Sequence, residues 1–191
     1  MRSFLILATS LLAATPAWSD EAALNAFRDE ARTASADFGK RLGGELKKAL
    51  GAGGPEAAIG VCKDVAPAIS SDLSRQKGWK VSRVSLKARD PLLGLPDAWE
   101  QKVLMDFDKR VAAGEKPETL EFAEEVSEPQ GKALRYMKAI PTQELCLTCH
   151  GPADAMPEGL RKTISADYPH DKATGYGVGQ VRGAFTFKKP L

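Results

Sequence analysis

Five consecutive residues near the C-terminus carry the clearest chemistry in this chain. They read Cys146-Leu147-Thr148-Cys149-His150, the Cys-x-x-Cys-His pattern of covalent haem attachment. The two thiols add across the vinyl groups of a porphyrin, and the histidine that follows offers its imidazole to the iron. Because the vinyl positions and the iron axis are fixed in haem, the spacing of the three residues is fixed too. We predict one covalent haem c per chain, with Cys146, Cys149 and His150 in its site.

Other uses of the motif require partners that the sequence does not place nearby. A structural zinc ion needs four ligands, and the missing ones would come from Cys62 or His170, both far from the motif. A thioredoxin-like dithiol is expected beside a βαβ pattern, and no such pattern is predicted here. A disulfide between Cys146 and Cys149 is the weakest of these alternatives. Haem attachment is therefore the preferred interpretation.

The N-terminus has the features of a secretory signal. Arg2 precedes an apolar stretch over residues 4–14, and the small residues Ala17 and Ser19 form a cleavage site before Asp20. This stretch is shorter than the roughly 20 residues that span a bilayer. We predict a signal peptide over residues 1–19 and a single exported domain over 20–191, with no membrane span after cleavage. The expected location is the periplasm, because this type of haem attachment follows export.

Charge and cysteine content narrow the possible partners. The 27 basic and 25 acidic residues are interspersed along the chain, so nothing favours nucleic acid as a partner. The chain has 3 cysteines, and Cys62 has no obvious partner once the motif is set aside. An odd thiol in an oxidising compartment needs an explanation.

Hydrophobic periodicity predicts two helices at the start of the chain. Apolar residues at steps of three and four predict a long helix from Leu24 to Leu50 that ends at Gly51–Gly54. Pro55 can open a second helix, whose apolar stripe includes Cys62 and ends near Leu73.

The rest of the chain is richer in strand patterns. Strands are predicted at 79–86, 118–126, 132–140 and 181–187, and helices from about Asp97, at the cysteine motif and at 157–166. Because helices come first and strands mostly afterwards, the sequence predicts an α+β fold with an antiparallel sheet.

The iron ligand opposite the motif's histidine stays open when only the residues are considered. Met105 is out of phase with the apolar stripe of its helix, Met137 fits a strand core, and Met156 is too close to the motif. His170 offers an imidazole from a loop. Cys62 is either a thiolate ligand or a small buried hydrophobe.

Several segments together resemble the PAS-like c-type haem domain family. They cover most of the chain after the predicted signal peptide, and they are residues 61–69, 83–91, 96–100, 146–151, 168–171 and 173–176. The resemblance implies a PAS-like antiparallel sheet that holds the haem through unusual Cys/His ligation. Carried over by motif, His150 is the proximal ligand and Cys62 the distal one. The chain departs from the family at Asp90-Pro91-Leu92, where an Asn-Pro-x-Asn pattern is usual.

Three basic residues are candidates for pairing with the haem propionates. Arg83, Lys87 and Arg89 lie in a predicted strand and the loop that follows it. They are equally consistent with solvated surface charges.

The expected function is redox or gas sensing, or single-electron transfer, by a monohaem cytochrome. A thiolate ligand such as Cys62 lowers the reduction potential, and a diatomic gas could displace it. A redox or signalling protein is the expected partner. One rival is an ordinary electron carrier with a histidine or methionine as second ligand. Another is a peroxidase-type enzyme, which requires a distal acid–base group that only His170 could supply.

Overall fold

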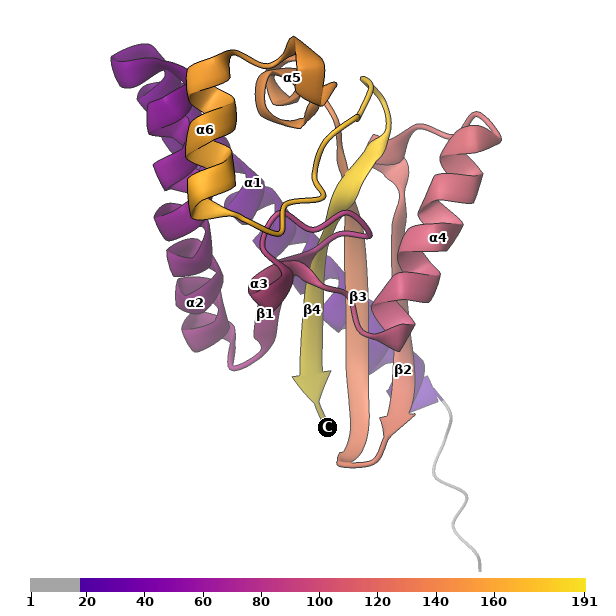
Figure 1. Cartoon of the computed structure of the whole chain (residues 1–191). Helices are drawn as coiled ribbons and strands as arrows, with labels where there is room; N and C mark the ends of the chain where they lie inside the picture. The colour runs from indigo at the N-terminus through magenta and orange to yellow at the C-terminus, as the bar shows by residue number, and fades with distance from the viewer. Residues whose placement is uncertain (1–17) are drawn as a thin grey trace, which may run out of the picture.

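A four-stranded antiparallel sheet with helices on both faces forms the body of the molecule in this computed structural model (Figure 1). The structure describes residues 18–191. Most of the predicted signal peptide, residues 1–17, lies outside this range. Within residues 18–191 no helix is long and apolar enough to cross a membrane. The predicted α+β fold, with its antiparallel sheet and long N-terminal helices, is confirmed.

The sheet has the strand order β1-β4-β3-β2, so the last strand of the chain, β4, lies between β1 and the hairpin formed by β2 and β3. Its strands are β1 (Lys80–Val84), β2 (Glu121–Glu128), β3 (Gly131–Pro141) and β4 (Val181–Pro190). Both faces of β3 and β4 are covered, which explains why their buried residues run almost without interruption.

Two N-terminal helices cover one face of the sheet. Helix α1 (Trp18–Gly60) is broken at Gly53 and Gly54, and Gly54 adopts φ 72°, which a residue with a side chain rarely does. The predicted break between two helices is therefore present. Phe27 and Phe38 of α1 pack with Phe187 of β4 in a shared apolar core. Helix α2 (Ala66–Lys77) follows and packs against β1.

The segment between these helices differs from the prediction of one regular helix. Residues Val61–Val65 form a single π-helical turn that contains Cys62. A π-turn inserts one extra residue into the helical repeat, and such insertions are frequent at functional sites. Helical periodicity alone does not detect it, because the apolar stripe continues on both sides.

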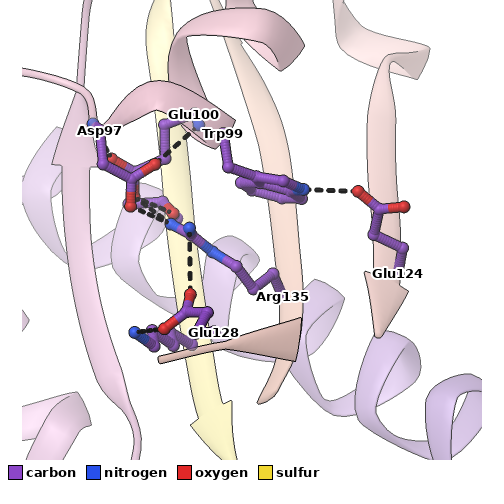
Figure 2. A network of polar contacts seen from close by, with 8 residues as sticks. Asp97, Trp99, Glu100, Glu124, Glu128 and Arg135 are labelled. Atoms are coloured by element: carbon purple, nitrogen blue, oxygen red, sulfur yellow. Dashed lines mark hydrogen bonds and ion pairs between the residues drawn. The ribbon is translucent and has the colours of Figure 1, made fainter. Parts of the chain in front are cut away.

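Helix α4 (Ala98–Ala112) covers the other face of the sheet. Its N-terminus is closed by a capping box between Asp97 and Glu100. Both carboxylates also bind Arg135 of β3, which lies buried beside the Trp99 ring (Figure 2). This network fixes the start of α4 on the sheet. The helix is preceded by the short α3 (Pro91–Gly94), where the sequence predicted only a loop.

The predicted cysteine motif lies on α5 (Glu144–His150), which follows directly after β3. Two short 3₁₀ turns, Pro117–Thr119 and Ala153–Ala155, complete the connections around β2 and α5. Helix α6 (Glu158–Asp167) then contacts α1, and a long segment returns past α5 into β4 (Figure 1). The motif is thus enclosed by elements from both halves of the chain.

Candidate functional site

The two motif cysteines are three residues apart on α5, one helical turn, and both are free and half-buried. Cys149 packs against an apolar cluster that includes Ile59 of α1 and Leu160 of α6. Burial in this surrounding raises the pKa of the Cys149 thiol. Both thiols therefore lie on one helical turn, with Cys149 against the apolar cluster.

His150 is held as a neutral imidazole with a defined tautomer. Its Nδ1 lies 2.8 Å from the carbonyl oxygen of Ala173, which can only accept, so Nδ1 carries the proton. Arg182 Nε lies 3.3 Å from the same nitrogen and cannot also donate to it. Burial first, and then the charges of Arg182 and Arg89, hold the pKa of His150 well below its ordinary value of 6.5. The Nε2 lone pair is thereby left for a metal.

The surroundings of His150 are strongly positive. Arg89 is buried, with a side chain 7% exposed, and within residues 18–191 its Nε and Nη1 atoms have no hydrogen-bond partner. Burial lowers the pKa values of Arg83 and Arg182 nearby. Of these three arginines, Arg89 alone forms an ion pair within residues 18–191, and its partner is Asp171. Unpaired buried guanidinium atoms are costly, so the site fits an anionic group such as the two propionates of haem.

Cys62 lies three residues after Ile59, which belongs to the apolar cluster that Cys149 contacts. The thiol is half-buried in the π-turn. Burial lowers the pKa of Arg83, raises that of Cys149 and raises that of Tyr168 to about 12, and in each case Cys62 is close enough to contribute electrostatically. The fold therefore brings Cys62 and the motif helix into one neighbourhood. Cys62 and His150 are 88 positions apart in the numbering, so only the fold brings their segments together.

Lys87, the third predicted propionate partner, is placed differently. Its Nζ donates to the Thr174 carbonyl at 2.6 Å and lies 4.3 Å from the centroid of the Tyr176 ring. It also lines a cavity of about 470 Å³ between β4 and α4. Lys87 thus contacts the segment that follows α6. Of the three predicted propionate partners, Arg83 and Arg89 are the ones that lie near His150.

Of the remaining ligand candidates, Met156 lies in the apolar cluster that Cys149 contacts, whereas His170, Met105 and Met137 lie elsewhere. His170 is solvent-exposed, and Met105 is 47% exposed on α4. Met137 is fully buried in the core beneath α4, and Met156 packs with Ile59 and its neighbours. Residues 18–191 contain no group of three or more His, Cys, Asp or Glu side chains arranged to hold a metal ion.

Three contributors to the site were missed from the sequence: Arg182, Asp171 and the carbonyl of Ala173. Arg182 Nη1 donates to Ser85 Oγ at 3.0 Å, which joins β4 to the residue after β1. Strand alternation marks Arg182 as facing one side of a sheet, but no local signal relates that side to α5. A backbone carbonyl leaves no signal in side-chain chemistry at all.

Two comparisons with known proteins found a match. The model of the Tll0287-like family matches residues 13–190. A solved structure, the crystal structure of the cyanobacterial haem protein Tll0287, is similar with a TM-score of 0.63 and 25% sequence identity, covering 85% of this chain and 94% of that one. No curated protein matches. The family resemblance predicted from the sequence is confirmed, and the chain belongs to the Tll0287-like family.

Proposed function

We propose that this chain is a periplasmic c-type cytochrome with one haem held by thioether bonds at Cys146 and Cys149. The observation that carries the proposal is the state of His150, neutral, with Nδ1 bonded to a carbonyl and Nε2 free. This is how proteins present histidine to a metal. The similarity to a haem protein supports the same cofactor.

In this proposal each side chain has a defined task. His150 would hold the iron through Nε2, and Cys62 would be its second ligand as a thiolate. Arg83, Arg89 and Arg182 would offset the propionate charges, which would compensate the cost of burying the Arg89 guanidinium. When bound, haem supplies a centre that accepts or releases one electron. The protein's task is to set how readily that occurs.

The biological role that we propose is redox or gas sensing, or single-electron transfer to a protein partner. Thiolate ligation by Cys62 favours oxidised iron and a low potential. It also allows exchange for carbon monoxide or nitric oxide after reduction. A spectral change of the reduced protein under either gas supports sensing, whereas no change under both leaves electron transfer as the role.

Haem attachment is tested by intact-mass measurement of the protein purified from cells that carry the haem c maturation system. The expected species begins at Asp20 and is heavier than the polypeptide by one haem, which resists extraction with acidified organic solvent. The double variant Cys146→Ala/Cys149→Ala is expected to lose this mass, whereas His170→Ala keeps it. A wild-type protein of polypeptide mass alone contradicts the proposal, and recovery with residues 1–19 still attached contradicts export.

A further inference from the structure

We infer that Asp171 and Arg89 are positioning residues that hold the Ala173 carbonyl against His150 and so keep the imidazole in its metal-binding tautomer. The inference rests on the proposed function, because the tautomer matters only if His150 Nε2 binds iron. It goes beyond it by assigning a task to a buried ion pair outside the motif.

The ion pair is well enclosed. Asp171 Oδ2 lies 3.2 Å from Arg89 Nη2, and the two side chains are 10% and 7% exposed. At such burial, loss of one partner leaves a charge that is poorly solvated, and breaking the pair is strongly unfavourable. The pair is therefore suited to hold its two backbone segments in one arrangement.

Both members of the pair reach the backbone around His150. Asp171 Oδ1 accepts a hydrogen bond from Ala173 N at 2.7 Å, which sets the conformation of the residue whose carbonyl meets His150 Nδ1. Arg89 Nη2 donates to the carbonyl of Cys149 and, at 3.4 Å, to that of Ala173. The same pair thus contacts Cys149, the residue before His150, and Ala173, whose carbonyl accepts the hydrogen bond from His150.

Backbone hydrogen bonds complete the connection between the two segments. Gly175 N donates to the Gly151 carbonyl at 2.8 Å, and Tyr176 N donates to the His150 carbonyl at 2.9 Å. On the other side Lys172 N donates to the Ala88 carbonyl at 3.0 Å. Residues 171–176 are therefore fastened both to the end of α5 and to the loop after β1, with the ion pair at the junction.

The guanidinium of Arg89 can serve this pair and the cofactor together. Its Nη2 makes all the contacts described, whereas Nε and Nη1 remain buried without a partner. Because those two atoms are free, a propionate can bind Arg89 without displacing Asp171. Removing Asp171 would disturb the histidine without removing a haem-contacting group.

The test compares haem-loaded Asp171→Asn with wild type in the reduced state, by ¹H–¹⁵N spectroscopy of the His150 Nδ1 proton. Asparagine retains an acceptor for Ala173 N but loses the charge beside Arg89. We expect exchange of the Nδ1 proton with water to become about ten-fold faster. The size of this effect is taken from the loss in metal affinity, about ten-fold or greater, that follows removal of a partner of a metal-binding histidine. The reduction potential is expected to rise, because a weaker hydrogen bond from Nδ1–H to the Ala173 carbonyl makes the imidazole a poorer electron donor.

Glu100→Gln is the matched control. It removes a buried carboxylate from a guanidinium on the other face of the sheet, where Glu100 and Arg135 side chains are 6% and 4% exposed and 3.1 Å apart (Figure 2). It is expected to lower stability toward denaturant. The exchange rate of the His150 Nδ1 proton and the reduction potential are expected to stay at wild-type values. Arg89→Lys serves as a second probe should Asp171→Asn fail to fold, and the same two changes are expected.

Two failures are distinguishable. If wild type carries no covalent haem, the proposed function is wrong. If wild type is loaded and the Asp171→Asn protein has the exchange rate and potential of Glu100→Gln, the positioning role is overturned, since the pair would then contribute to stability alone.

Discussion

The guanidinium of Arg83 lies 5.6 Å from the centroid of the Phe38 ring, on the face of the sheet that α1 covers. Among residues 18–191 it has no carboxylate partner, and its pKa is lowered by burial. If the proposed haem is bound, a cation in this position, close to Cys62, would act on the iron through its charge. We predict that Arg83→Gln lowers the reduction potential of the haem, because loss of a positive charge favours the oxidised state.

Arg83→Lys is the control for this prediction, since it keeps the charge and loses the planar group. Its potential, measured by spectroelectrochemistry beside that of Arg83→Gln, is expected to stay closer to wild type. Equal reduction potentials in wild type, Arg83→Gln and Arg83→Lys would show that the charge of Arg83 has no effect on the haem.

Replacement of Cys62 tests the second iron ligand. The ferric wild-type protein is expected to show a low-spin thiolate signature in optical and electron paramagnetic resonance spectra, and Cys62→Ala is expected to lose it. His170→Ala should leave the spectra unchanged, because His170 is exposed on its loop. Coincident spectra of wild type and Cys62→Ala would instead identify Cys62 as a core residue.

Glu121 makes stability depend on acid pH. The hydrogen bonds from Arg32 and, after it, from the Tyr136 hydroxyl hold the pKa of Glu121 below its ordinary value of 4.5, against the effect of burial. A lowered folded-state pKa stabilises the protein above the unfolded pKa, and this contribution is lost as pH falls through the folded one. The ion pair is partly exposed, with Arg32 and Glu121 side chains 49% and 20% accessible, so solvent screening limits it to about 1 kcal/mol or less.

We therefore predict that Glu121→Gln is less stable than wild type at pH 7 by about this amount. The difference should shrink below the unfolded pKa of Glu121 and vanish once its carboxylate is protonated in the folded protein. Urea unfolding at several pH values measures it. A difference that stays constant down to the most acid pH would rule out the ion pair as its source.

The cluster around Arg135 contributes to stability on the α4 face. Arg135 lies 2.7 Å from an Asp97 oxygen and 3.1 Å from Glu100, and 4.3 Å from the Trp99 ring centroid (Figure 2). Arg135→Met would leave the buried Glu100 carboxylate without its cation. We expect a loss of about 3 kcal/mol in the free energy of unfolding, typical of a broken buried pair.

Thermal or urea unfolding at pH 7 measures this loss, with Lys102→Met on the exposed side of α4 as control. The control is expected to change stability by less than about 0.5 kcal/mol. If Arg135→Met changed the free energy of unfolding as little as the control does, the buried network would make no measurable contribution to stability.

The sequence by itself determined the features that depend on neighbouring residues. The proposal of covalent haem attachment follows from the spacing of Cys146, Cys149 and His150, which matches a rigid cofactor. The break in α1 follows from Gly53 and Gly54, because glycine reaches backbone angles closed to other residues. Strand alternation and helical periodicity are likewise local, and so the α+β class was predictable.

The tertiary structure decided which distant groups meet. Ser85 and Arg182 are 97 residues apart, yet they are hydrogen-bonded because β4 pairs with β1. The Ala173 carbonyl reaches His150 only because residues 171–176 fold back along α5. The π-turn at Cys62 is similarly invisible to periodicity, since it adds one residue within an apolar stripe. Sheet register and chain return depend on packing of the whole core, and short-range patterns carry no information about either.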